Sequence, residues 1–377
     1  MTARNGTLAW LSNETPAVDG SGGQRRQFHQ IKALTETGID VHPILLASSQ
    51  NDASIKRLTR TTRYTTAPWD RRLLRPSREL KRILTADMPN AAVVAHIESF
   101  PSVARLLTSL NLPVAIDFHN VNSRWYDTVG QHQEAELWRA RERAALGSTS
   151  LATCCSGQER DALRRLLPGA RIEVAANGVD PDEWPASALR AEREPVVAVF
   201  ATWSHAPNRI GLEWFFESVW PAIIHERHDA RLVVVGPGSP PSAPNDLPGI
   251  HVAGRVADLA GFLGGVQVIA VPIVKGIGAR MKFGEALASG AAVVSTSVGA
   301  EGADAGARFV TADSGSDFSR ACLELLANPR GADELGRRAR AWSLRELAWQ
   351  RTVAPILDWY TRLAGSPGPA VHPDETF

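Results

Sequence analysis

Two cations and a carboxylate follow a glycine loop at fixed spacing in the second half of the sequence. The glycines are Gly276 and Gly278, and Arg280, Lys282 and Glu285 come after them. Cations beside the free N–H groups of a helix start favour a diphosphate, because the helix dipole and the side-chain charges add. A carboxylate one turn further accepts hydrogen bonds from ribose hydroxyls. The alternative is a surface pair of Lys282 with Glu285, but the glycine loop favours the binding site.

A second glycine loop lies near the start of the chain, between a predicted strand and a predicted helix. It contains Gly20, Gly22 and Gly23. Glycines at such a place let backbone N–H groups approach an anion closely. A tight turn without a ligand explains them equally well. Arg25 and Arg26 follow directly, so the dinucleotide pattern Gly-x-Gly-x-x-Gly is absent.

Short apolar runs alternate with helical periodicity along most of the chain, which predicts parallel sheets built from βα units. The first series predicts strands at 7–12, 40–46, 91–95, 113–117, 150–153 and 171–174, with helices at 24–37, 99–110, 134–146 and 157–167. The second predicts strands at 196–201, 231–235, 250–252, 267–271 and 291–295, with helices at 207–224, 258–264 and 279–289. Two further helices are predicted at 332–342 and 344–363.

A stretch of turn-forming residues from 177 to 184 separates the two series. A chain of 377 residues is long enough for two cores. We therefore expect an amino-terminal domain at 1–185 and a carboxyl-terminal domain at 186–364. The remaining residues, 365–377, are rich in Pro and Gly and are expected to be disordered.

The composition is that of a globular protein, with 44% hydrophobic and 21% charged residues. No apolar run is long enough for a membrane span, and the first residues do not resemble a secretory signal. We therefore expect a cytoplasmic protein. A net charge of +1 gives no general attraction to nucleic acid, so no nucleic-acid partner is predicted. Cys154, Cys155 and Cys322 fit neither a disulfide framework nor a zinc site and are predicted to be core residues.

The segment from Lys56 to Arg82 is strongly basic. It holds ten Lys or Arg residues against the two acids Asp70 and Glu79. One interpretation is a solvated loop and helix face. The other is a surface for anionic lipid or an anionic acceptor, which would place the protein peripherally at the inner membrane face.

The run from Pro272 to Thr296 resembles the donor-site signature of the retaining GT-B glycosyltransferases of the family-4 type (glycosyl transferases group 1). It shows the variant in which Gly-x-Gly-x-Arg-x-Lys precedes Glu-Ala-x-Ala-x-Gly. Gly22 and Gly23 are similar to the family's amino-terminal glycine loop, and His119 to its fourth-strand histidine. The resemblance extends from residue 7 to about 345. It implies an α/β fold with two Rossmann-like domains facing a central cleft, and a C-terminal helix that returns to the N-terminal domain.

The resemblance also implies roles for single residues. His119 would lie near the donor sugar, although a structural loop histidine is the alternative. Arg280 and Lys282 would hold the diphosphate and Glu285 the ribose; with His119 these are the expected catalytic residues. The other expected donor contacts are Gly22, Gly23, Gly254, Arg255, Val256, Gly276 and Gly278, of which Gly254, Arg255 and Val256 would border the base.

The implied reaction transfers a sugar from a nucleotide diphosphate sugar to an acceptor hydroxyl with retention. The acceptor, a glycan, a lipid-linked sugar or a natural product, would meet His96, Glu98 and Trp125. Lys275 stands where the family commonly has a Glu, which leaves the sugar open. The alternatives are an epimerase or phosphorylase on the same fold, or a non-catalytic sugar-nucleotide-binding protein.

No metal or other cofactor is expected. Asp180 and Asp182 resemble the Asp-x-Asp metal site of another glycosyltransferase fold, but they lie in the linker. We find no other His, Cys, Asp and Glu cluster with metal-ligand spacing. Two cations at the diphosphate would perform the task of a magnesium ion.

Overall fold

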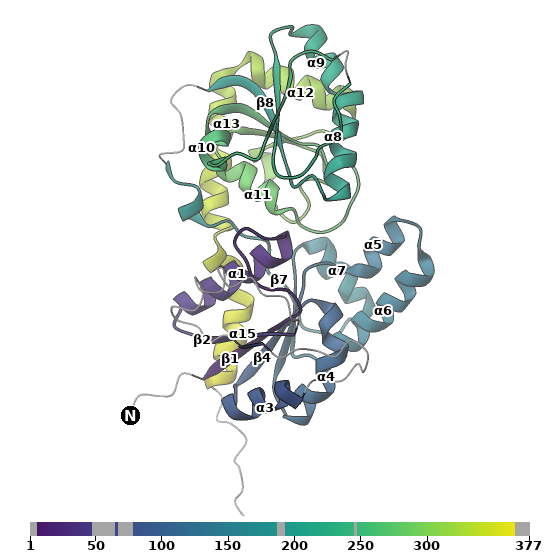
Figure 1. Cartoon of the computed structure of the whole chain (residues 1–377), viewed down its shortest axis with the longest axis vertical. Helices are drawn as coiled ribbons and strands as arrows, with labels where there is room; N and C mark the ends of the chain where they lie inside the picture. Colours follow the sequence, from purple (N-terminus) through teal and green to yellow (C-terminus); the bar gives the residue numbers. More distant parts are fainter. Residues whose placement is uncertain (1–5, 47–64, 67–77, 187–192, 245–246, 366–377) are drawn as a thin grey trace, which may run out of the picture.

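Two parallel sheets, each covered by helices, organise the computed structural model (Figure 1). The structure describes residues 6–46, 65–66, 78–186, 193–244 and 247–365. The first sheet has the order β3-β2-β1-β4-β5-β6-β7 and the second the order β10-β9-β8-β11-β12-β13. This confirms the two Rossmann-like domains.

The first sheet is made of β1 (Thr7–Ser12), β2 (Asp40–Leu45), β3 (Thr65–Thr66), β4 (Ala91–Ala95), β5 (Val114–Phe118), β6 (Leu151–Cys154) and β7 (Ile172–Val174). Its helices are α1 (Gly22–Glu36), α3 (Arg78–Asp87), α4 (Phe100–Ser109), α5 (Asn122–Thr128), α6 (His132–Gly147) and α7 (Gly157–Leu166). Every residue of β4 and β5 is buried, as expected for central strands covered on both faces.

The second sheet is made of β8 (Glu194–Phe200), β9 (Arg231–Val235), β10 (Ile250–Gly254), β11 (Val266–Val271), β12 (Ala292–Ser295) and β13 (Val310–Thr311). The helices that follow β8 are α8 (Ala206–Ser218), α9 (Trp220–Glu226), α10 (Leu259–Gly264), α11 (Met281–Ala288), α12 (Gly315–Ala327) and α13 (Pro329–Glu346). The chain ends in α14 (Trp349–Thr352) and α15 (Ala354–Gly365).

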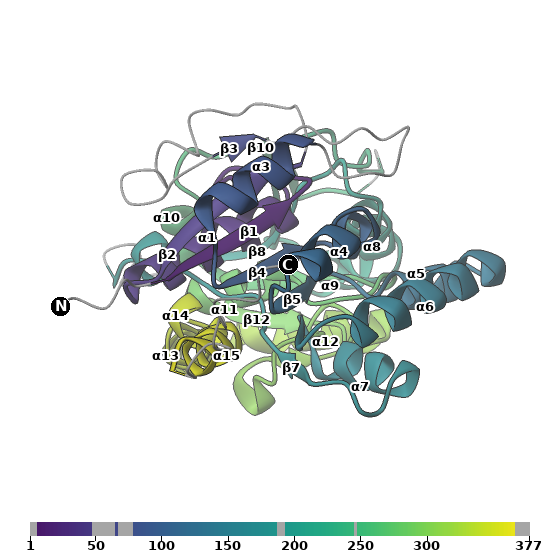
Figure 2. The ribbon, with the colours of Figure 1, turned by 90° about the horizontal axis from the view of Figure 1, so that it is seen from below.

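The last helix, α15, returns to the first sheet, as the resemblance implied. Trp359 donates from Nε1 to Ser150 Oγ over 3.0 Å, and the Tyr360 hydroxyl donates to the carbonyl of Gly6. Both rings pack in one buried cluster with Leu8 and Trp10 of β1. Figure 2 shows α14 and α15 on the side of the molecule opposite to α5 and α6.

Several helices differ from the sequence predictions. The range 207–224 is two helices, because Pro221 lacks the N–H that a continuous helix needs and the chain turns at Val219. The range 344–363 is also broken, because the carbonyl of Leu347 accepts the N–H of Val179 (2.7 Å) instead of continuing the helix. The prediction missed β3, α3, α5, α12 and β13.

Two predictions fall mainly outside the described residues. Of the expected disordered tail, only Gly365 is described, and it closes α15. Of the basic segment from Lys56 to Arg82, the described part is residues 65–66 and the first half of α3. All three cysteines are buried, as predicted. Within the described residues, no helix combines the length and the apolar composition needed to cross a membrane.

Helix α13 supports α11, the helix that carries Lys282 and Glu285. The Ser343 hydroxyl of α13 donates to the carbonyl of Gly284 over 3.0 Å. Gly336 of α13 packs on the turn between α11 and β12, where a Cβ would overlap the carbonyl oxygen of Gly290. Backbone meets backbone there, so neither side can move aside cheaply.

This contact generates a prediction with a definite sign. Helix propensity alone makes Gly336→Ala stabilising by about 1 kcal/mol. The backbone overlap makes it destabilising instead, by about 1–3 kcal/mol or more, because α13 must shift from α11. Urea unfolding followed by tryptophan fluorescence measures the difference. Gly169→Ala is the control, since a Cβ there meets nothing within 4 Å. A Gly336→Ala protein as stable as wild type would contradict the packing.

Candidate active site between the two domains

A buried ion pair lies at the base of the site. Arg26 of α1 donates from Nε and Nη2 to the two carboxylate oxygens of Asp117 at the end of β5, over 2.9 and 2.8 Å. Both side chains are almost completely buried. Burial opposes ionisation of Asp117, but the charge of Arg26 and hydrogen bonds outweigh it and hold its pKa well below the usual value. In the sequence, Arg26 indicated only that the dinucleotide-binding pattern Gly-x-Gly-x-x-Gly is absent. Nothing there predicted its ion pair with Asp117.

The same arginine reaches the linker and, through it, the second domain. Arg26 Nη1 donates to Asn177 Oδ1 over 3.0 Å, and Asn177 Nδ2 donates to the carbonyl of Ala279 over 3.1 Å. Ala279 immediately precedes Arg280 in the glycine loop. A fixed polar chain therefore connects the core of the first domain with the predicted diphosphate loop.

Two histidine rings contact each other beside this pair, tilted by 52°. The rings of His96 and His119 lie 3.8 Å apart, and His119 Nε2 is 3.2 Å from Asp117 Oδ2. Burial lowers the pKa of both, that of His96 to about 4 with a further contribution from His119. Both rings are therefore neutral at pH 7. His96 has a positive φ of 74°, a sparsely populated conformation of the kind that clusters at functional sites.

The amino-terminal glycines lie against these histidines and against the second domain. A Cβ at Gly23 would lie 3.1 Å from both His119 Nδ1 and His96 Cε1, so only glycine fits there without displacing them. A Cβ at Gly22 would lie 4.0 Å from Met281 Sδ at the start of α11. Both glycines belong to the first turn of α1, which Ser21 caps together with Gln24. The helix starts two residues earlier than predicted.

The remaining acceptor candidates are more peripheral. Glu98 is exposed and accepts a hydrogen bond from Asn122 Nδ2 over 2.7 Å. Trp125 on α5 is 36% exposed. Its neighbour Arg124 forms an ion pair of 2.8 Å with Glu301 of the second domain. The described contacts thus place α5 at the domain interface without joining Trp125 to the histidine pair.

Arg280 is the N-cap residue of α11 and leaves the helix start without a side-chain cap. Its Nη1 donates to the carbonyl of Ile277. Nε and Nη2 are buried and have no hydrogen-bond partner among the described residues. Buried guanidinium nitrogens without partners are costly and call for an explanation, which a bound anion would supply.

Lys282 is the second residue of α11, and its side chain points toward α8. Its ammonium donates to Asn208 Oδ1, while Asn208 Nδ2 is tied to the carbonyl of Thr202 over 2.7 Å. Burial and the charge of Arg280 lower the pKa of Lys282 to about 7, against the opposing effect of Glu285. An anion at this place would raise that pKa again. Nothing in the sequence showed that Asn208 contacts Lys282.

Glu285 is paired across the domain interface. Arg25 of α1 contacts Glu285 Oε1 from Nη2 at 2.6 Å, and the same nitrogen lies 3.7 Å from Glu183 Oε2 in the linker. The Glu285 side chain is only 8% exposed. The predicted ribose ligand is therefore occupied by a cation of the other domain. The sequence gave no sign of this contact, because 260 positions separate the two residues.

The residues expected to border the base lie after β10. Gly254 has a φ of 66° and open space where a Cβ would be, Arg255 is exposed and Val256 is half-buried. No described contact joins them to Arg280 or Lys282. Gly276 and Gly278 have φ values of 132° and 80°, which explains the glycines of the donor loop.

One more carboxyl faces the donor loop from the first domain. Glu159 of α7 accepts the N–H of Cys155 with Oε2 over 2.9 Å. Its Oε1 would lie 3.3 Å from a Cβ at Gly278 and has no described partner. Burial raises the pKa of Glu159 to about 7. The sequence indicated Glu159 only as a residue within the α7 helix.

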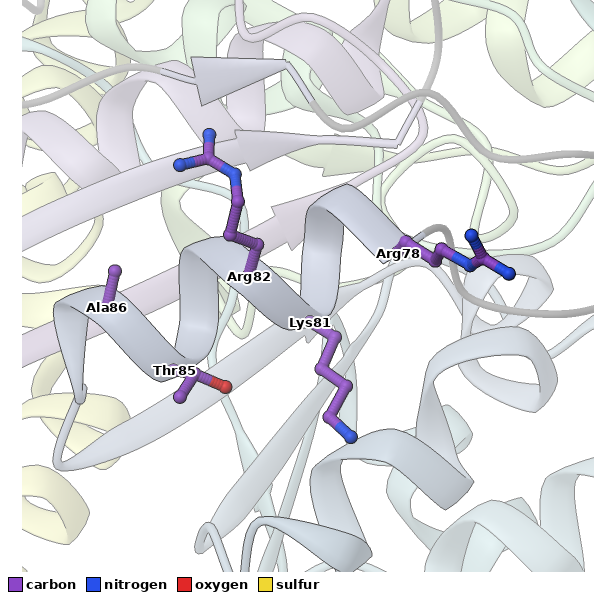
Figure 3. Close-up of a pocket in the computed structure, with 5 residues that line it drawn as sticks. All are labelled: Arg78, Lys81, Arg82, Thr85 and Ala86. Carbon is purple, nitrogen blue, oxygen red and sulfur yellow. The ribbon is translucent and has the colours of Figure 1, made fainter.

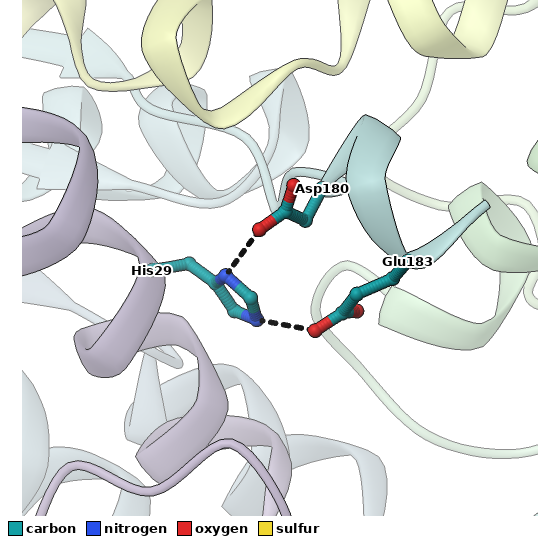
Figure 4. A group of neighbouring side chains, drawn as sticks. All are labelled: His29, Asp180 and Glu183. Carbon is teal, nitrogen blue, oxygen red and sulfur yellow. Dashed lines mark ion pairs between the residues drawn. The ribbon is translucent and has the colours of Figure 1, made fainter. Parts of the chain in front are cut away.

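A cluster of His29, Asp180 and Glu183 is the one group among the described residues with metal-ligand types in proximity. Figure 4 shows that the two ring nitrogens of His29 face different carboxylates, at 3.7 Å for Asp180 and 3.5 Å for Glu183. A single ion can bind only one of these nitrogens. Lys32 already pairs with Asp180 at 2.6 Å. Burial and the charge of Arg25 lower the pKa of His29 to about 4. The His29 ring also stacks on Trp349 of α14, so we interpret the cluster as packing between α1, the linker and α14.

The described part of the basic segment forms an exposed helix face. Figure 3 shows a shallow pocket on α3 lined by Arg78, Lys81, Arg82, Thr85 and Ala86. Arg82 is paired with Glu79 one turn away, at 2.6 Å. This face belongs to the outer helix of the first sheet and does not contribute to the site between the domains.

The buried ion pair yields a stability prediction. Arg26→Met leaves the Asp117 carboxylate buried without its cation, and we expect a loss of about 3–5 kcal/mol. In wild type the Asp117 pKa is depressed, so the pair stabilises fully above the ordinary aspartate pKa of about 4 and less as pH falls toward the depressed value. The penalty in Arg26→Met should therefore shrink in acid.

Urea unfolding at several pH values measures both effects. Arg82→Met serves as the control, because it removes an arginine from an exposed pair and should not shift the midpoint measurably. A loss below 1 kcal/mol for Arg26→Met at neutral pH, or one independent of pH, would show that the pair does not hold the two elements together.

Comparisons with known proteins agree with this architecture. The model of Glycosyltransferase Family 4 matches residues 20–183, and that of Glycosyl transferases group 1 matches residues 194–328. No curated protein matches the chain by sequence.

Several solved glycosyltransferase structures share the fold. Sucrose-phosphate synthase from Thermosynechococcus elongatus has a TM-score of 0.73 at 17% identity, covering 95% of this chain and 99% of that one. HepE of Anabaena, in complex with UDP and glucose, has a TM-score of 0.68 at 14% identity, covering 95% and 100%. A variant of TarM from S. aureus, in complex with Fondaparinux, α-GlcNAc-glycerol and UDP, has a TM-score of 0.72 at 11% identity, covering 96% and 100%.

The two family models match on either side of the linker: the first covers the first sheet except β1, and the second covers the whole second sheet and the loop before α11. The protein therefore belongs to the group 1 glycosyltransferases and has the GT-B fold.

Proposed function

We propose that this glycosyltransferase moves a sugar from a nucleotide diphosphate sugar to an acceptor hydroxyl, with retention and without a metal ion. The observation that carries the proposal is the uncapped start of α11, where Arg280 holds buried nitrogens without partners beside Lys282. Two cations and a helix dipole are suited to the charge that develops on a departing diphosphate. HepE, a structural relative, binds UDP and glucose.

The first domain contributes the opposite wall of the proposed site. Gly22 faces Met281 of α11 and Gly23 lies against His119, and without a Cβ both glycines would let the backbone of α1 come close to a bound donor. A neutral His119 can accept a hydrogen bond from one sugar hydroxyl or donate one to another. Because it carries no charge, it does not compete with Arg280 and Lys282 for the diphosphate. Retention is proposed from the family resemblance, with the leaving phosphate taking the acceptor proton.

The acceptor is proposed to enter along the first domain, past His96, Glu98 and Trp125. Trp125 offers an apolar ring face of the kind on which sugars stack. Gly254, Arg255 and Val256 are proposed to border the base. The segment from Lys56 to Arg82 is proposed to bind an anionic membrane surface, because it holds ten Lys or Arg residues.

The proposal is tested first by binding and then by turnover. A thermal-shift screen with UDP, GDP and ADP identifies the nucleotide, since a ligand at about 100 times its Kd adds about 2.7 kcal/mol of stability. The nucleotide sugars of the best diphosphate are then incubated with candidate acceptors. Diphosphate release that requires an acceptor distinguishes a transferase from an epimerase or a binding protein.

Lys282→Ala should lower kcat by about 100- to 1,000-fold, as when one preorganised donor is removed from an oxyanion site. The reason is that Lys282 is proposed to act on charge that grows as the diphosphate leaves, so the loss appears in kcat more than in KM. Arg337→Ala is the control, because it removes an exposed cation of α13 in the same domain, paired with Glu334 and outside the candidate site. Turnover of Lys282→Ala within about threefold of wild type, roughly 0.7 kcal/mol, would move the donor site elsewhere.

Transfer should also survive excess EDTA. The physical reason is that Arg280 and Lys282 would supply the positive charge that a magnesium ion supplies in other enzymes. Initial rates are compared in EDTA, in magnesium and in manganese with the same enzyme preparation. An activity that EDTA abolishes and either metal restores would refute this part of the proposal.

A further inference from the structure

We infer that Arg25 occupies the ribose ligand Glu285 in the ligand-free protein, and that nucleotide binding transfers Arg25 to Glu183. Arg25 is thus a residue of the first domain that sets donor affinity by competing with the ribose. The inference rests on the proposed function, because it takes Glu285 as the ribose ligand. It adds a competitor for that ligand and a place for the competitor to go.

The geometry places one guanidinium nitrogen between two carboxylates. Arg25 Nη2 lies 2.6 Å from Glu285 Oε1 on α11 and 3.7 Å from Glu183 Oε2 in the linker. The Arg25 side chain is 24% exposed, that of Glu285 8% and that of Glu183 33%. A movement of about one ångström, within ordinary thermal displacement, exchanges one partner for the other. The long arginine side chain makes this movement without displacing α1.

The contact with Glu285 excludes a ribose for a physical reason. A carboxylate binds a ribose by accepting hydrogen bonds from hydroxyls, and a guanidinium uses the same oxygen lone pairs. The pair is mostly buried, so it is screened by water less than a surface pair. Its strength is visible in Arg25, whose pKa is raised chiefly by the charge of Glu285. A ribose must therefore displace Arg25 before it can use Oε1.

Glu183 is suited to receive the displaced cation. Burial raises the pKa of Glu183, and Arg25 is the nearest compensating charge. Moving Arg25 closer to Glu183 therefore offsets part of the cost of leaving Glu285. This makes the exchange a two-position switch rather than the release of an unpaired buried arginine into the site.

The exchange has a measurable consequence for affinity. While Arg25 holds Glu285, only the fraction of molecules with a free carboxylate binds the nucleotide fully, so the apparent Kd equals the intrinsic Kd divided by that fraction. Removing a cation from an anion site would ordinarily weaken the binding of a diphosphate. The inference predicts the opposite sign.

The test is isothermal titration of wild type and Arg25→Ala with the diphosphate selected by thermal shift from UDP, GDP and ADP. We expect Arg25→Ala to lower the Kd by at least about fivefold, the lower end of typical coupling between sites. A Kd within twofold of wild type, or a higher one, overturns the inference. A higher Kd would identify Arg25 as a direct ligand of the phosphates.

Two control variants separate the specific effect from general ones. Lys32→Ala removes another cation of α1 that pairs with the linker, at Asp180, and does not contact Glu285. Gln350→Ala removes the hydrogen bond of 2.9 Å between α14 and Glu36 of α1, in the chain segment that returns from the second domain to the first. Both should leave the Kd within twofold. A gain in affinity equal to that of Arg25→Ala would mean loosened domains and would overturn the inference.

A second background makes the role of Glu285 explicit. In Glu285→Gln, Arg25 has no carboxylate to pair with at position 285. Adding Arg25→Ala to this variant should therefore no longer strengthen binding of the diphosphate. Circular dichroism verifies that each variant is folded. If no diphosphate binds to wild type or to Arg25→Ala, the proposed function fails and this inference fails with it. If the diphosphate binds to wild type and to Arg25→Ala with the same Kd, only the inference about Arg25 fails and the proposed function stands.

Discussion

The buried pair of Arg26 with Asp117 is the interaction on which the rest of the site depends. It couples α1 to the end of β5 at the centre of the first domain, where neither charge is solvated. A buried guanidinium with one unsatisfied nitrogen would be costly, and Asn177 accepts from the remaining one. Asn177 in turn holds the carbonyl before Arg280. One electrostatic requirement in the core thus fixes the position of the donor loop in the other domain.

The two faces of the interface divide the chemical tasks. The second domain supplies positive charge at the start of α11, where Lys282 has a pKa of about 7 because burial and Arg280 disfavour its charge. The first domain supplies two neutral histidines, which lie against Gly23 at the start of α1. An anion is therefore attracted to one wall, while the other wall accommodates uncharged hydroxyls. This asymmetry is the physical basis of the proposed transfer reaction.

The interface is closed by ion pairs that join residues far apart in the chain. Arg25 with Glu285 and Arg124 with Glu301 each connect an arginine of the first domain to a glutamate of the second. Partly buried pairs of this kind hold a geometry, yet exchange when a ligand offers comparable contacts. The domain interface and the proposed donor site therefore share charged groups, and we expect ligand binding to change the contacts between the domains.

The sequence by itself determined the fold, most of the strands and the helix that carries the cations. Short continuous apolar runs predicted β1, β4 and β9 to the residue, because strands of a parallel sheet that are covered on both faces are apolar along their length. The sequence analysis missed α12 and two helix breaks. A single proline outweighs helical periodicity at Val219, and a contact with Val179 from another segment does so at Leu347. The sequence analysis placed Arg280, Lys282 and Glu285 on one helix, but only the tertiary structure could decide their partners. Asn208, Arg25 and Asn177 reach them from distant positions, and such contacts depend on how two sheets pack, which no local pattern encodes.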